Sequence, residues 1–135
     1  MEKFKYCLFD LDGTLTDPGE GITKSVQYAL RSLGIDEPDL KKLERFIGPP
    51  LKDSFMKYYG FSDKQAEEAI GKYREYFAVT GIFENRVYEG IETMLKNLRS
   101  SGRTLLVATS KPEEFAVKIL EHFRLAPYFD WVCGA

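Results

Sequence analysis

The segment that most constrains the fold lies near the N-terminus and reads Tyr6-Cys7-Leu8-Phe9-Asp10-Leu11-Asp12-Gly13-Thr14-Leu15-Thr16-Asp17. It begins with a short apolar run, which predicts a strand buried on both faces of a sheet. The run stops abruptly in carboxylates and a glycine, so two acidic side chains are expected where the strand ends. In open α/β sheets, ligands bind at the carboxyl ends of the strands. This segment therefore predicts a binding or catalytic site beside residue 10.

The spacing of the two carboxylates has a chemical meaning. Asp10 and Asp12 alternate with Leu11, so both can lie on one side of the loop that follows the strand. One carboxylate can attack an electrophile while the other handles the proton of the leaving group. Both can lie near a hard cation, which prefers oxygen ligands. Gly13 permits a sharp turn, and Thr14 can hydrogen-bond within it. For an isolated Asp-x-Asp, a helix cap with a solvated acidic turn is the alternative.

A second group of polar side chains follows another apolar run. Residues 105–108 predict a buried strand, and Thr109, Ser110 and Lys111 come directly after it. Because parallel strands end at the same edge of a sheet, Thr109 is expected near Asp10. The helix that follows would offer unpaired N–H groups and a positive dipole end, which suit phosphate. Taken alone, the hydroxyl is also explained as an ordinary helix cap, and the lysine as a solvated charge.

Together, the 6–17 segment and Thr109 resemble the first and second motifs of the haloacid dehalogenase (HAD) superfamily of phosphotransferases. The resemblance implies that Asp10 is the nucleophile, which forms an aspartyl-phosphate, and that Asp12 is the general acid/base. It implies Mg²⁺ as the cofactor, bound by the Asp10 carboxylate and the Asp12 backbone carbonyl. An acid at position 12 favours phosphoryl transfer over dehalogenation, since the dehalogenases of this superfamily lack it. The phosphate-binding residues that the resemblance implies are Thr109, Ser110, Lys111, Leu11 and Gly13.

The rest of the chain predicts an α/β core that is interrupted by helices. Apolar residues at helical spacing predict about four helices in a row between residues 19 and 80. Helix and strand then alternate, which is typical of a parallel sheet. We expect a Rossmann-like parallel sheet core, incomplete in this chain, in residues 1–16 and 86–135. Residues 17–85 would form an inserted α-helical cap, as in one HAD subgroup.

The inserted segment leaves the chain beside the acidic loop, so we expect a lid that excludes water and selects the substrate. A helical domain that only adds bulk is the alternative. The stretch 46–51 resembles a substrate-facing loop of phosphoglycolate-phosphatase-like proteins, which implies substrate contacts for Gly48, Pro49 and Pro50. An ordinary linker is the alternative for this loop. Residues 81–85, 107–112 and 115–123 look most like a 5′-nucleotidase-like branch.

The amino-acid composition limits the kinds of partner and the cellular location that can be expected for this protein. Lys and Arg total 19 against 21 acidic residues, which leaves a net charge of −2 and no basic run. We therefore expect neither a nucleic-acid nor a membrane partner. The apolar runs are too short to span a bilayer, and the N-terminus has no signal-peptide pattern. Cys7 and Cys133 are typical of small buried hydrophobes in a reducing compartment, so a cytoplasmic protein is expected. The oligomeric state is not predicted.

The family pattern continues beyond Ala135, with a Lys that neutralises charge at the site and an acidic pair that completes the Mg²⁺ site. We therefore expect these residues to be part of a larger enzyme, with little or no activity on their own. The leading function is a Mg²⁺-dependent phosphomonoester hydrolase that acts on a small soluble phosphate, either a nucleoside monophosphate or a phosphoglycolate-like ester. The alternatives are a phosphomutase of the same superfamily, or an inactive truncated scaffold that acts as a binding protein.

Overall fold

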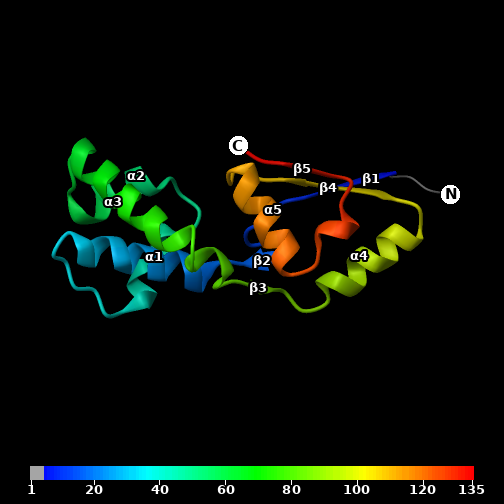
Figure 1. The fold of residues 1–135 in the computed structure, drawn as a ribbon, viewed down its shortest axis with the longest axis horizontal. Coiled ribbons are helices and arrows are strands. Elements are labelled where there is room, and N and C mark those ends of the chain that lie inside the picture. The colour runs from blue at the N-terminus through cyan, green and yellow to red at the C-terminus, as the bar shows by residue number, and fades with distance from the viewer. Residues whose placement is uncertain (1–4) are drawn as a thin grey trace. The chain divides into compact units, whose positions relative to one another are not determined.

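The computed structural model describes residues 5–135 of the 135-residue chain. The chain divides into two compact units (Figure 1). The sheet unit comprises residues up to Asp17 together with Arg86–Ala135, and the helical unit comprises Pro18–Asn85. Within the described residues, no helix is long and apolar enough to cross a membrane.

The sheet unit is built on a three-stranded parallel sheet in the order β1-β4-β5. The strands are β1 (Tyr6–Phe9), β4 (Thr104–Ala108) and β5 (Trp131–Cys133). The helices of this unit are α4 (Ile91–Ser100), α5 (Glu113–His122) and the 3-10 helix η3 (Ala126–Tyr128). Helix α4 precedes β4 and α5 connects β4 to β5, which gives the crossovers that parallel strands require (Figure 1). The predicted α/β class with a parallel sheet is confirmed.

A second, very small sheet lies where the chain leaves for the helical unit and returns from it. Strand β2 (Thr16–Asp17) pairs antiparallel with β3 (Arg86–Val87). Asp17 faces Arg86 in the register, and Asp17 Oδ2 lies 3.0 Å from Arg86 Nη2. These short strands were not predicted, because two-residue segments carry no periodicity.

The two faces of the parallel sheet differ in burial. Leu105 and Val107 of β4 are fully buried on one face, together with apolar residues of α4 and α5. On the other face, Tyr6, Leu8 and Trp131 are 62%, 70% and 61% exposed. The prediction that the first strand is buried on both faces is therefore wrong. Within residues 5–135, only one face is closely covered by α4 and α5.

The same exposed face corrects a second prediction. Trp131 and Cys133 alternate with Val132 along β5, and Cys133 is exposed rather than buried. Cys7, on β1, is half-buried. Both cysteines are free thiols, on strands that are separated by β4.

The helical unit contains only helices and loops, as the sequence predicts. Its elements are α1 (Gly19–Ser32), the 3-10 helix η1 (Leu40–Phe46), α2 (Leu51–Tyr59), α3 (Asp63–Phe77) and the 3-10 helix η2 (Gly81–Phe83). The predicted capping box at the start of α3 is confirmed. Ser62 Oγ accepts from the Gln65 backbone N–H at 3.2 Å, and Gln65 Oε1 accepts from the Ser62 N–H at 2.9 Å. Local sequence thus determines where this helix begins.

The core of the helical unit lies between α1, α3 and the aromatic residues of η1 and α2. Phe46 and Phe55 are buried, with ring centroids 5.0 Å apart. Helix α1 approaches η2 so closely that a Cβ atom on Gly21 would lie 1.9 Å from the Gly81 carbonyl oxygen. The side chain of Glu84 then accepts hydrogen bonds from Lys24 and Tyr76, which ties the end of the unit to α1 and α3.

Candidate active site

The acidic loop leaves β1 and folds back on itself around one buried side chain. Leu11 is fully buried, and its carbonyl accepts from the Leu15 and Thr16 N–H groups at 2.9 and 3.1 Å. Gly13 donates to the Thr16 carbonyl at 2.7 Å and has a φ of 80°, a conformation that favours glycine. The loop therefore holds residues 10 and 12 at the carboxyl end of the strand.

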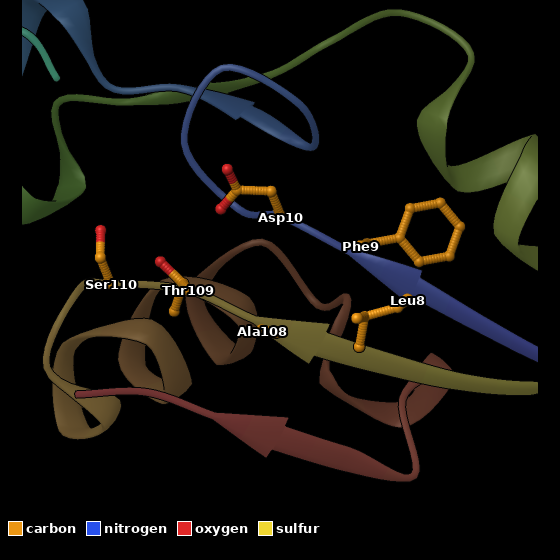
Figure 2. A pocket seen from close by; sticks show the side chains of 6 residues that line it. All are labelled: Leu8, Phe9, Asp10, Ala108, Thr109 and Ser110. Carbon is orange, nitrogen blue, oxygen red and sulfur yellow. The ribbon is translucent and has the colours of Figure 1, made fainter.

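Asp10 lies directly after β1 and lines an open cleft of about 520 Å³. Its Oδ1 accepts from the Leu11 N–H at 2.8 Å, which restrains the carboxylate. The cleft is also lined by Leu8, Phe9, Ala108, Thr109 and Ser110. Figure 2 shows the Asp10 carboxylate and the hydroxyls of Thr109 and Ser110 facing the same opening beyond the strand ends. The structure thus brings the two polar groups from neighbouring strands together.

Thr109 is held by bonds on both sides of its side chain. Its backbone N–H donates to the Cys133 carbonyl at 3.0 Å, and its Oγ1 accepts from the Lys111 N–H at 3.1 Å. Since the hydroxyl oxygen already accepts a bond, the hydroxyl proton can be directed toward an acceptor in the cleft. This geometry suits an anionic oxygen.

Asp12 has two differently placed carboxylate oxygens. Oδ2 lies 3.2 Å from Lys111 Nζ. Oδ1 is buried and has no hydrogen-bond partner among the residues that the structure describes. Burial raises the pKa of the Asp12 carboxyl, the Lys111 ammonium partly offsets this, and the Asp10 charge adds to the rise. A carboxyl group with a raised pKa retains a proton more readily, which a general acid requires.

The other four residues that were predicted to bind phosphate do not all face the cleft with free donor groups. Ser110 is exposed at the cleft, but Lys111 is only 9% exposed and points to Asp12. The N–H groups of Leu11 and Gly13 already donate to Asp10 Oδ1 and the Thr16 carbonyl. Either one would have to exchange that bond to contact a phosphate.

The loop that was predicted to face the substrate belongs to the helical unit. Gly48, Pro49 and Pro50 connect η1 to α2, and Gly48 has a φ of 107°. The glycine is required there because residues with a Cβ rarely adopt this conformation. Substrate contact by this loop stays a prediction.

The donor atoms at the end of β1 can be compared with the needs of Mg²⁺. Within residues 5–135, no group of three or more His, Cys, Asp or Glu side chains is placed to hold a metal ion. Mg²⁺, however, commonly keeps several waters and uses one or two carboxylates together with substrate phosphates. The Asp10 carboxylate and the Asp12 carbonyl are hard oxygen donors two residues apart in the chain, which fit this pattern, and a cleft opens beside Asp10.

This geometry defines a class of protein: an α/β fold in which two carboxylates follow the first parallel strand, and one of them, Asp10, lines an open cleft together with the hydroxyl residue Thr109 of the neighbouring strand end. The model of the haloacid dehalogenase-like hydrolase family matches residues 7–135. The chain belongs to this family, which confirms the resemblance that its motifs indicate.

The chain is also similar to individual proteins of this kind. It is 56% identical over 133 residues to a 5′-nucleotidase of Pseudomonas aeruginosa, and this match covers 98% of the chain and 60% of the relative. It is 39% identical over 128 residues to the tyrosine-protein kinase PtkA of Mycobacterium tuberculosis, covering 95% and 43%. A phosphoglycolate phosphatase of Aquifex aeolicus is 32% identical over 127 residues, covering 94% and 59%.

A solved structure supports the fold. The crystal structure of a Clostridium difficile protein is 56% identical and superposes with a TM-score of 0.95, covering 100% of this chain and 62% of that one. The chain therefore spans about three fifths of the length of the Pseudomonas aeruginosa relative and of the Clostridium difficile protein.

Two residues with a clear structural role, Lys111 beside Asp12 and Asp130 beside β4, were not predicted in those roles. No local pattern indicates them, since their partners lie in distant segments.

Proposed function

We propose that the protein is a Mg²⁺-dependent phosphomonoester hydrolase that acts through an aspartyl-phosphate on Asp10. The observation that carries the proposal is the pair of unlike carboxylates after β1. Asp10 lines an open cleft, while Asp12 has a buried oxygen and a raised pKa. A nucleophile beside a carboxyl group that can hold a proton is the arrangement that phosphate ester cleavage through a covalent intermediate needs.

The first step forms the covalent intermediate. An oxygen of Asp10 attacks phosphorus, and the bond between phosphorus and the ester oxygen breaks. Asp12 gives its proton to the departing oxygen, which leaves as an alcohol. The Thr109 hydroxyl donates to an oxygen of the transferring group, a role supported by the Lys111 N–H bond that occupies its acceptor side.

The second step releases phosphate. Asp12, now a carboxylate, takes a proton from a water molecule as the water oxygen attacks phosphorus. The bond between phosphorus and Asp10 breaks, so inorganic phosphate leaves and both side chains return to their starting states. Asp12 thus serves as acid and then as base.

Two groups of this chain would hold Mg²⁺: the Asp10 carboxylate and the Asp12 carbonyl. When bound, the ion supplies positive charge that offsets the charge on the transferring phosphoryl group.

The 5′-nucleotidase and phosphoglycolate phosphatase relatives support a nucleoside monophosphate or a phosphoglycolate-like ester as substrate. We also propose that residues 17–85 act as a cap that selects the substrate through Gly48, Pro49 and Pro50. The free thiols support a cytoplasmic location.

Phosphoryl transfer to an acceptor other than water is a second candidate. The 39% identity to a protein named as a tyrosine kinase favours testing it. A phosphomutase would use the same aspartyl-phosphate, with a substrate hydroxyl as the acceptor in place of water. Added alcohols or tyrosine peptides that take up labelled phosphate at the expense of phosphate release would identify this chemistry.

The proposal is tested by hydrolysis of p-nitrophenyl phosphate with and without Mg²⁺, after the intact mass of the purified protein has been measured. We expect Asp10→Asn to lower any metal-dependent turnover by at least about a thousandfold. The exposed Asp36→Asn in the helical unit is the matched control and should keep the wild-type rate. Wild-type turnover in Asp10→Asn would contradict the assigned nucleophile.

A further inference from the structure

We propose that Lys111 is a positioning residue that fixes the Asp12 carboxylate through Oδ2, so that Oδ1 is the oxygen that exchanges a proton with the leaving group. This inference rests on the proposed phosphatase function and replaces the predicted phosphate contact of Lys111. It assigns the lysine to the proton-transfer half of the site, not to the phosphate-binding half.

The contacts of Asp12 carry the inference. Lys111 Nζ lies 3.2 Å from Oδ2, and its side chain is only 9% exposed. The other oxygen, Oδ1, is buried without a hydrogen-bond donor in the described part of the chain. A buried polar atom without a partner is unfavourable unless a ligand supplies one. The leaving-group oxygen, as it accepts the proton, is the partner that the proposed reaction brings to this atom.

Hydrogen bonds on both sides of Lys111 fix its backbone, which limits the positions that its side chain can reach. Its N–H donates to Thr109 Oγ1 at 3.1 Å, and its carbonyl accepts from the Ala135 N–H at 3.0 Å. The chain after β5 passes so close that a Cβ atom on Gly134 would lie 2.4 Å from Glu113 Cα and 2.7 Å from the Lys111 carbonyl oxygen. The position of this lysine is therefore fixed jointly by the end of β4, the start of α5 and the segment after β5.

The two possible roles of the lysine have different consequences. A phosphate-binding lysine contacts the group that every substrate shares, so its loss weakens all substrates and inorganic phosphate alike. A lysine that positions Asp12 matters only where the leaving oxygen needs a proton. The alkoxide of a nucleoside monophosphate needs one, but p-nitrophenolate leaves readily without it.

The test compares kcat/KM of Lys111→Met on uridine 5′-monophosphate and p-nitrophenyl phosphate. This parameter ends with formation of the aspartyl-phosphate, so hydrolysis of the intermediate does not enter it. We expect at least about a tenfold larger loss for the nucleotide, with an unchanged inhibition constant for inorganic phosphate. Equal losses on both substrates, or weaker phosphate inhibition, would overturn the inference.

Two further variants separate positioning from a general structural defect. Lys111→Met should add little to the loss already caused by Asp12→Asn, because both changes remove the same proton transfer. Lys111→Arg keeps the charge and should recover part of the nucleotide rate. Additive losses in the double variant would contradict the inference.

A spectroscopic measurement tests the pairing independently of turnover. The ¹⁵N-labelled Lys111 ammonium, assigned by its loss in Lys111→Met, should give a protected signal that Asp12→Asn shifts or abolishes. Asp10→Asn should perturb it much less. If Mg²⁺-dependent turnover survives Asp10→Asn, the proposed function fails. The inference about Lys111 fails separately if Asp12→Asn leaves the ammonium signal of Lys111 unchanged.

Discussion

The helical unit and the sheet unit bury their apolar side chains in different ways. In the helical unit, large side chains such as Phe46 and Phe55 are enclosed between helices. In the sheet unit, Leu105 is fully buried, whereas Leu8, which lies on the other face of the sheet, is 70% exposed. The helices complete a core within their own unit, but the sheet that carries the candidate site is closely covered on one face only.

The difference follows from how each unit is built. A helix needs one apolar stripe covered, and neighbouring helices supply that cover. A parallel sheet has two faces, and parallel sheets usually have both covered. Here the candidate site lies at the end of a sheet that α4 and α5 cover on one face within the described residues. Substitutions in the two units should therefore have effects of different size.

The largest effect is expected in the enclosed aromatic core. Phe55→Ala removes a ring that contacts Phe46 and stacks on Phe61, with centroids 5.0 and 5.8 Å away. It should lower the free energy of unfolding by about 3–5 kcal/mol. Met56→Ala, at a more exposed neighbouring position of α2, is the control and should cost far less. Urea denaturation measures both, and equal losses would contradict the enclosed core.

A matched pair tests the two faces of the sheet. Leu105→Ala removes a fully buried side chain and should cost about 2–5 kcal/mol. Leu8→Ala makes the same change on the exposed face and should cost less than about 1 kcal/mol. Thermal and urea unfolding compare the two variants. A Leu8→Ala loss as large as that of Leu105→Ala would mean that the exposed face is covered in solution.

Two glycines in the helical unit should respond with opposite sign. In α1, Gly21→Ala would place a Cβ 1.9 Å from the Gly81 carbonyl oxygen, and it should destabilise by about 1–3 kcal/mol. In α3, Gly71→Ala meets nothing within 4 Å and should stabilise by about 0.5–1 kcal/mol through helix propensity. The change in unfolding midpoint gives both signs. Stabilisation by Gly21→Ala would show that α1 and η2 are not in close contact.

The contrast between the units also explains which features were predictable. The capping box of Ser62 and Gln65 is local, so the sequence alone indicates it. The exposure of Leu8 depends on which face the crossover helices cover, and the apolar run of β1 does not encode this. The Asp12–Lys111 pair depends on two loops that meet only when the strands align. The motif residues were therefore found, but their partners were not.

The smallest effect concerns the carboxylate that ties the segment before β5 to β4. Asp130 Oδ2 accepts from the Leu105 N–H at 3.0 Å and from Arg99 Nη1 at 2.7 Å. These bonds favour the charged form and hold the pKa of the Asp130 carboxyl below its usual 3.8. Because the folded-state pKa is lowered, the carboxylate stabilises the fold above the unfolded-state pKa, and this contribution is lost as the pH falls through the folded-state value.

Asp130→Asn should therefore lower the unfolding temperature slightly near neutral pH, and the difference from wild type should shrink as the solution is acidified below about pH 4. Thermal unfolding between neutral and acidic pH measures this, with the exposed Asp36→Asn as control. A difference that stays constant with pH would mean that the geometry of the side chain matters and its charge does not. Since Asp130 acts only in the sheet unit, a pH-dependent loss there would show that this less enclosed unit relies on polar ties as well as on its single covered face.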